Sequence, residues 1–204
     1  MSRLGAALYD MTLRVPEDAG LREMRRELLA GARADVLEIG AGTGLNFALY
    51  PAAVTRVRAL EPDAAMAKRA GGKAAVATVP VELMAGSAQA LPFPDATFDT
   101  VVGTLVLCTV PDPAGALEEV ARVLRPGGRY LFLEHVRDEE GRAARRQDRV
   151  TPLWRHLAGG CHPNRETLKT LSASALAVEQ VHRGQFPKAV RIVRPLILGA
   201  ARAE

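Results

Sequence analysis

Three glycines follow an apolar stretch of the chain at residues 36–44, which read VLEIGAGTG. An apolar run followed by Gly40, Gly42 and Gly44 predicts a buried strand that ends at a tight turn. Because glycine has no Cβ and adopts positive φ without strain, such a turn lets backbone N–H groups approach a ligand closely. An acid, Glu38, stands two residues before the first glycine. The stretch therefore predicts a loop that binds a nucleotide-like cofactor.

The spacing of the glycines separates two kinds of cofactor. A dinucleotide fingerprint needs a glycine at the sixth position of the motif, which is Leu45 here, whereas this chain places its third glycine earlier, at Gly44. The string Glu-x-Gly-x-Gly-x-Gly resembles motif I of the class I S-adenosylmethionine (SAM) methyltransferases, in which the turn cradles the methionine part of the cofactor. The resemblance implies SAM as the cofactor and a binding set in this stretch: Glu38, Gly40, Ala41, Gly42, Gly44 and Asn46.

A second acid follows the next predicted strand. Residues 54–60 alternate apolar and polar side chains and stop at Glu61-Pro62-Asp63. An acid at the carboxyl end of such a strand can accept two hydrogen bonds from ribose hydroxyls, so we expect Glu61 and Pro62 to bind the cofactor. The alternative is that Glu61 only precedes a helix N-cap, because Pro62 and Asp63 are typical of a helix start.

The adenine position departs from the family pattern. Residues 79–85 predict a third strand that leads to Ser87 and Ala88. Related methyltransferases often carry Asp at the position of Ser87, where it contacts the adenine amino group. In this chain the Ser87 hydroxyl or the Ala88 backbone N–H would have to make that contact.

The stretch after the fourth predicted strand indicates the chemistry of the acceptor pocket. Thr104, Leu105 and Cys108 follow a strand expected at residues 98–102, where open α/β sheets place their ligand crevice. DNA and protein-glutamine amino methyltransferases have an Asn/Asp-Pro-Pro-Tyr signature here, and this chain does not. We therefore expect an apolar acceptor pocket in which Thr104 and Leu105 also contact the cofactor. Cys108 is expected to be a buried, inert thiol, because no base lies near it in the sequence.

Two side chains are candidates for catalysis. The string LRPGGRYLFLEH resembles the helix-to-fifth-strand junction of class I methyltransferases, and it delivers His135 to the same edge of the sheet as Gly40. His135 would orient the acceptor or take its proton, and the alternative is a packing role. Tyr9 lies in a predicted N-terminal helix, and methyltransferases of this type resemble the chain in having an N-terminal Tyr that closes over the cofactor. A Tyr packed on the sheet edge is its alternative.

The order of the predicted elements indicates an α/β fold. The resemblance implies a Rossmann-like class I methyltransferase with a seven-stranded, mostly parallel sheet, an antiparallel last strand, and helices on both faces. We expect residues 1–33 to form an N-terminal helical lid and residues 34–204 to form the methyltransferase domain. The first lid helix is expected over residues 4–13, with a buried face that comprises Leu4, Leu8, Met11 and Leu13. Further helices are expected at residues 45–50 and 138–157 and after Asn164, which would cap the last of them.

Composition excludes several classes of partner. The chain has 27 Lys and Arg against 23 Asp and Glu, and 4% aromatic residues, which favours solvated helix faces over a nucleic-acid surface. Its two cysteines are not in a paired spacing, and Cys161 is too close to His162 for both to bind one metal ion, so no metal site is expected. The sequence contains no signal peptide and no apolar run long enough to span a bilayer. A cytoplasmic protein without an integral membrane segment is expected, and its oligomeric state stays open.

The chain as a whole resembles the small SAM-dependent methyltransferases, and within them the group of methyltransferase-like alkyl-thiol methyltransferases. The narrower matching blocks are TLVLC, EHV, and GGC followed by an Asn/Arg helix. The resemblance implies methyl transfer to a small-molecule acceptor, and a thiol fits because it is partly ionised near neutrality and needs little help from a base. A hydroxyl acceptor would instead need His135 or Tyr9.

Other functions remain open at this point. An amine, a phospholipid headgroup or a quinone-type carbon would also serve as acceptor. A non-catalytic SAM-binding protein would have nearly the same sequence. An NAD-dependent dehydrogenase would also place Glu61 on a ribose, but Leu45 breaks its glycine spacing.

Overall fold

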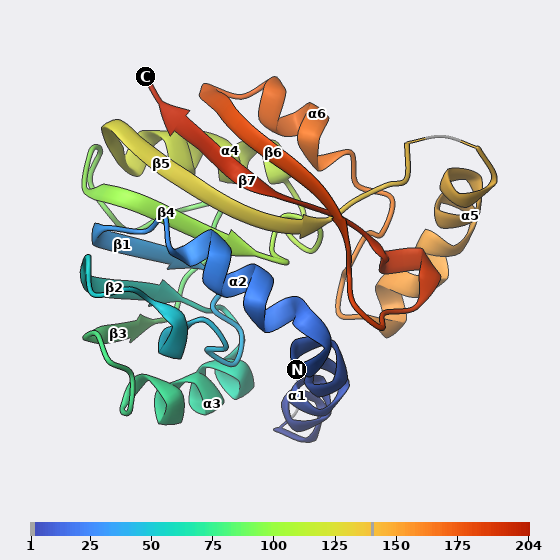
Figure 1. Ribbon diagram of the computed structural model, residues 1–204, viewed down its shortest axis with the longest axis horizontal. Coiled ribbons are helices and arrows are strands. Elements are labelled where there is room, and N and C mark those ends of the chain that lie inside the picture. Colours follow the sequence, from blue (N-terminus) through green and yellow to red (C-terminus); the bar gives the residue numbers. More distant parts are fainter. Residues whose placement is uncertain (1–2, 140) are drawn as a thin grey trace.

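A seven-stranded sheet forms the centre of the structure, with helices on both faces (Figure 1). This computed structural model describes residues 3–139 and 141–204. The strand order is β3-β2-β1-β4-β5-β7-β6, and β7 alone runs antiparallel to its neighbours. The predicted fold class is confirmed. In chain order the strands are β1 (Ala34–Ile39), β2 (Val54–Leu60), β3 (Val81–Met84), β4 (Phe98–Thr104), β5 (Leu124–His135), β6 (Leu176–Gln185) and β7 (Pro195–Ala203).

Two apolar cores separate the sheet from its helices. Leu28 and Leu29 of α2 and Ala70 of α3 share one core with Leu131 of the sheet, whereas Leu117 of α4 belongs to the other. Asp63 caps α3 as predicted, and Asp112 caps α4, because each side chain accepts backbone N–H groups of the first turn. The α-helices are α1 (Arg3–Pro16), α2 (Arg22–Leu29), α3 (Ala64–Ala74), α4 (Pro113–Val123), α5 (Gly141–Leu157) and α6 (Thr167–Ser172). Shorter helical turns are η1 (Glu17–Leu21), η2 (Phe47–Leu49) and η3 (Arg191–Val193).

The registers of the central strands decide which loops meet. Ile39 at the end of β1 pairs with Leu60 of β2 on one side and with Gly103 of β4 on the other, and Thr104 pairs with Leu133 of β5. The carboxyl ends of these parallel strands therefore lie at one edge of the sheet, where ligands bind in open α/β folds. Among the described residues, no helix is both long and apolar enough to cross a bilayer.

The N-terminal helices differ from the prediction in one respect. Leu13 is buried, but Leu8 is 50% exposed and Met11 is 68% exposed, so the predicted buried face of the first helix is wrong. Leu4 also belongs to the predicted face, and its side chain lies outside the described residues. The reason is that α1 lies beside the end of α3 rather than flat on the sheet, and the chain then bends at Gly20, which has φ of 127°. α2 does lie on the sheet, with Leu29 fully buried at its end and Leu21 fully buried just before its start.

Two other local predictions need correction. The helix expected at residues 45–50 is only the 3₁₀ turn η2, because the few residues between Gly44 and Pro51 leave room for one turn of i→i+3 bonding. Asn164 does not cap α6, whose N-cap is Glu166. The Asn164 amide instead donates to Asp148 of α5 at 3.2 Å.

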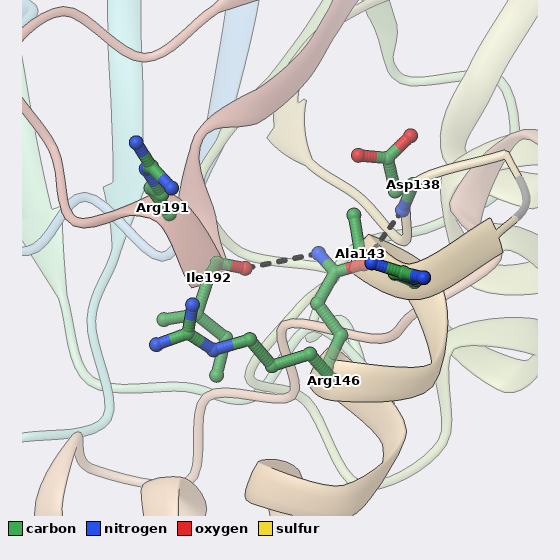
Figure 2. A pocket seen from close by; sticks show the side chains of 7 residues that line it. Asp138, Ala143, Arg146, Arg191 and Ile192 are labelled. Carbon is green, nitrogen blue, oxygen red and sulfur yellow. Dashed lines mark hydrogen bonds between the residues drawn. The ribbon is translucent and has the colours of Figure 1, made fainter.

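Gln147 joins three separate segments to α5. Its buried amide nitrogen donates to the carbonyl oxygens of Val136, Pro163 and Ile192, and its oxygen accepts from the Asp138 N–H at 2.7 Å. Figure 2 shows the bonds to Asp138 and Ile192 beside a surface hollow of about 240 Å³ between α5 and the start of η3. The end of β5, the loop that carries Cys161, and the connection from β6 to β7 are thus held together by one side chain.

We expect Gln147→Leu to destabilise the protein by about 2–3 kcal/mol, because it leaves several buried backbone groups without partners. The measurement is the free energy of unfolding in urea. Arg145→Leu places the same side chain at an exposed position of the same helix and should change stability by less than about 0.5 kcal/mol. Equal effects of the two substitutions would show that Gln147 does not hold these segments.

Candidate functional site

The turn that follows β1 contains three glycines in the left-handed backbone conformation. Gly40, Gly42 and Gly44 have φ of 60°, 58° and 78°. A Cβ at Gly40 would lie 2.7 Å from Val106, and one at Gly44 would lie 2.7 Å from the Phe47 ring, so these two glycines allow close packing. A Cβ at Gly42 would meet nothing within 4 Å. The middle of the turn is therefore the part that a ligand can approach.

Glu61 reaches the open middle of this turn from the end of β2. One carboxylate oxygen accepts the Gly42 N–H at 2.8 Å, and the other accepts the Asp63 N–H at 2.8 Å. The side chain is buried, which raises the pKa of its carboxyl, and the two backbone N–H groups oppose that rise. The structure thus brings Glu61 to the glycine turn, with the exposed Pro62 beside it. A carboxylate next to an open, glycine-lined backbone fits a nucleoside cofactor, because both can bind polar groups of one ligand.

Glu38 is buried beneath the turn. Its oxygens accept hydrogen bonds from the Asn46 amide at 3.0 Å and from the Tyr50 hydroxyl at 2.7 Å. Burial raises the pKa of Glu38 to about 7, although Tyr50, Asn46 and the nearby Arg25 each lower it. The predicted cofactor residues Glu38 and Asn46 are therefore bonded to each other below the turn.

A buried guanidinium links these residues to the N-terminal helices. Arg25 of α2 donates to Glu17 at 2.8 Å, to the Asn46 side-chain oxygen at 3.0 Å and to the Thr104 hydroxyl at 2.7 Å. The Asn46 amide also donates to Thr104 at 3.1 Å. The end of β4, the glycine-turn segment, η1 and α2 thus share one polar network. Sequence reasoning missed Arg25, because nothing in the helical pattern distinguishes it from Arg26.

Residues of α1 cover the outer side of the turn. The Asp10 carboxylate accepts from the Thr43 hydroxyl and from two nitrogens of Arg69 on α3. Tyr9 packs on the core, and the charge of Arg25 acts on its hydroxyl. Burial raises the pKa of Tyr9 to about 12, with Arg25 opposing. The hydroxyl therefore stays protonated at neutral pH, which suits a hydrogen-bond donor better than a base.

The loop after β4 takes its shape from a buried carboxylate. Glu134 is fully buried, and it accepts the backbone N–H groups of Val106 at 2.8 Å, Leu107 at 2.9 Å and Cys108 at 3.3 Å. Burial raises the pKa of Glu134 to about 7, and these N–H groups oppose the rise. Leu105 enters the loop with φ of 60°, an uncommon conformation for a residue with a side chain. Glu134 therefore fixes the segment that packs against Gly40.

His135 lies beside two sulfur atoms. Its Nε2 is 3.1 Å from the sulfur of Cys161, which also accepts from the Trp154 indole N–H at 3.2 Å. The interaction between Cys108 and Cys161 lowers the pKa of Cys161 to about 4 and raises the pKa of the buried Cys108 thiol. Cys108 is buried as predicted, but its partners come from segments that are distant in the sequence.

The predicted adenine residues are not part of these networks. Ser87 is exposed, and its hydroxyl accepts the Gln89 N–H at 3.2 Å. Ala88 is buried against the core under α4. The hollow of Figure 2 and a second one of about 310 Å³ near Val136 and Arg165 are lined by other residues, away from the glycine turn.

The raised pKa of Glu38 makes stability depend on pH in a defined window. A carboxyl that binds its proton more tightly in the folded state contributes stability that is present below its unfolded pKa of 4.5 and is lost as the pH rises to about 7. Glu38→Gln removes this group. We expect the stability of the wild type relative to Glu38→Gln to fall by on the order of 3 kcal/mol between pH 4.5 and 7.

Urea unfolding at several pH values measures this difference, and other titrating groups cancel because both proteins contain them. Glu82→Gln, at an exposed position of β3, is the matched control. A difference between wild type and Glu38→Gln that does not change with pH would contradict the raised pKa.

Comparison with known proteins identifies the family. Residues 37–132 match the methyltransferase domain family. The chain is 37% identical over 182 residues to the human thiol S-methyltransferase TMT1B, covering 84% of this chain and 72% of that protein. It is 37% identical over 138 residues to a phosphatidylethanolamine N-methyltransferase of Cereibacter sphaeroides, covering 66% of each.

A solved structure agrees on the fold. The SAM-dependent methyltransferase of Thermotoga maritima described as a possible histamine N-methyltransferase superposes with a TM-score of 0.72 at 20% identity, covering 99% of this chain and 98% of that one. The chain therefore belongs to the class I SAM-dependent methyltransferases, has SAM as its cofactor, and resembles the thiol S-methyltransferase group within them.

Proposed function

We propose that this enzyme transfers the methyl group of SAM to the sulfur atom of a small thiol. The observation that carries the proposal is the 37% identity to a thiol S-methyltransferase over 84% of the chain. The match extends well beyond the cofactor motif, so it includes the segments around Cys108, His135 and Cys161 that lie at the acceptor end of the sheet.

The chain's residues divide between two roles in this proposal. Gly40, Ala41, Gly42 and Gly44 supply the cofactor loop, Glu61 and Pro62 hold the ribose side, and Ser87 and Ala88 lie on the adenine side. Thr104 and Leu105 also contact the cofactor. Glu38 and Asn46 act from below the turn, where their mutual hydrogen bond fixes its shape. We also propose that residues 1–33 act as a lid, since Asp10 of α1 already bonds to Thr43 of the turn.

Methyl transfer to a thiol needs little acid–base catalysis. SAM supplies a methyl group on a positively charged sulfur, which a thiolate attacks in line. A free thiol has a pKa of about 8.5 and is partly ionised near neutrality. Charge is neutralised along the reaction, so the buried, apolar residues around Leu105 contribute by excluding water and fixing the approach.

An amine acceptor is the second candidate. The similarity to a phosphatidylethanolamine N-methyltransferase favours it, although that match covers a smaller share of the chain than the match to the thiol enzyme. An amine must lose a proton before it attacks, so this reaction would need a base such as His135.

The test is release of S-adenosylhomocysteine from SAM by the purified chain with a panel of acceptors. We expect turnover with small thiols and little with amines, quinols or phosphatidylethanolamine in vesicles. Turnover confined to any other class would exclude the thiol proposal and leave the family assignment unchanged.

Glu61→Gln tests the cofactor part separately. The loss of a charged hydrogen-bond acceptor should weaken SAM binding by about tenfold to a hundredfold, measured by calorimetry, without changing the preference among acceptors. Glu118→Gln, at an exposed position of α4, should bind SAM like the wild type. Unchanged binding by Glu61→Gln would remove Glu61 from the cofactor site.

A further inference from the structure

Three side chains of the types that bind metal ions lie together at the carboxyl edge of the sheet. Cys108 follows β4, His135 ends β5, and Cys161 lies in the loop between α5 and α6. One ligand atom from each lies within 4.8 Å of the other two. The sequence predicts no metal site, because Cys161 and its neighbour in sequence, His162, are too close for both to bind one ion. In the folded structure, however, the histidine beside Cys161 is His135.

From this cluster we infer a zinc site formed by Cys108, His135 and Cys161, with a fourth position that takes the acceptor thiolate. The inference rests on the proposed thiol acceptor only for the fourth position. Two thiolates and one imidazole are a known catalytic zinc set, which leaves one position for water or substrate. Soft sulfur ligands also favour zinc over magnesium or calcium.

The spacing of the ligand atoms suits such an ion. Bond lengths of about 2.3 Å to sulfur and 2.0 Å to nitrogen place tetrahedral ligands roughly 3.5–3.8 Å apart. Here His135 Nε2 and Cys161 Sγ are 3.1 Å apart, and no pair exceeds 4.8 Å. Small side-chain rotations would bring all three into range.

The surrounding residues hold the three ligands in place before any ion binds. The His162 N–H donates to the Cys108 carbonyl at 2.8 Å, which ties the two cysteine loops together. Glu134 holds the Cys108 backbone, and the Trp154 indole donates to the Cys161 sulfur. Hydrogen bonds of this kind orient ligands and tune affinity in metal sites.

The charge of the cluster also favours a cation. Zinc binds cysteine as the thiolate, so each cysteine would lose its proton when the ion binds. Two thiolates balance the charge of one zinc ion. His135 Nδ1 is buried and has no hydrogen-bond partner within residues 3–139 and 141–204.

The site lies on the acceptor side of the cofactor loop. Val106, in the same loop as Cys108, packs against Gly40. On binding, the acceptor thiol loses its proton to water. The new sulfur–methyl bond then forms as the methyl bond of the SAM sulfonium breaks, and neutral S-adenosylhomocysteine leaves.

Metal analysis of the purified full chain tests the site independently of activity. We expect one zinc per chain, removed by a chelator and restored by added zinc. Cobalt substitution should give the visible bands of a tetrahedral ion and sulfur-to-cobalt charge transfer, and these bands should shift when a small thiol is added without SAM. Cys108→Ser and Cys161→Ser should each lower zinc affinity by about a hundredfold or more.

His156→Gln is the matched control, since His156 is exposed on α5 outside the cluster, and it should keep full zinc affinity. Chelation and reloading of the wild type do not depend on the folding of a variant. No zinc in the wild type, a Cys108–Cys161 disulfide under reducing purification, or cobalt bands that ignore the thiol would each overturn the inference. Thiol turnover by zinc-free protein would overturn it and leave the proposed function intact, whereas a zinc-loaded enzyme that turns over only other acceptors would overturn the proposed function.

Discussion

The buried Arg25 guanidinium is the interaction on which the arrangement of the site depends. It lies 3% exposed and is bonded to Glu17, Asn46 and Thr104. A buried charge is costly unless its hydrogen bonds are satisfied, so the loss of one partner destabilises the others. Because these partners come from the N-terminal helices, the glycine-turn segment and the end of β4, the position of the helices over the site is coupled to the shape of the site.

Two buried carboxylates organise the edge of the sheet on either side of this guanidinium. Glu38 accepts hydrogen bonds from Asn46 and Tyr50 and so holds the segment after the glycine turn. Glu134 accepts three backbone N–H groups and so holds the loop after β4. Burial raises the pKa of each to about 7. The backbone that meets the cofactor and the backbone that leads to the sulfur cluster are thus shaped by side chains beneath them.

The segment that follows β5 also contributes residues to the carboxyl edge of the sheet. Gln147 connects α5 to the loop that carries Cys161, and the His162 N–H connects that loop to Cys108. The segment between β5 and β6 therefore does more than link two strands. It places the sulfur of Cys161 beside His135 at the end of β5, where a methyl acceptor would lie in the proposed reaction.

The sequence by itself determined the fold class, the cofactor motif and the strand ends that meet. The signals for these features are local in the sequence: the periodicity of the strands, the glycines from Gly40 to Gly44, and the acids beside each turn. Parallel strands necessarily place their carboxyl ends at one edge of the sheet. The cap residues Asp63 and Asp112 were also readable, because capping acts within one turn of helix.

Tertiary structure alone decided the rest, because those features depend on contacts between segments far apart in the chain. The exposed face of α1 could not be read from its apolar spacing, since Leu8 and Met11 have the right period but no surface to cover. Arg25 differs from its neighbours only by being buried. The meeting of Cys108, His135 and Cys161 requires three segments to be folded against one another, and no spacing within any one of them encodes it.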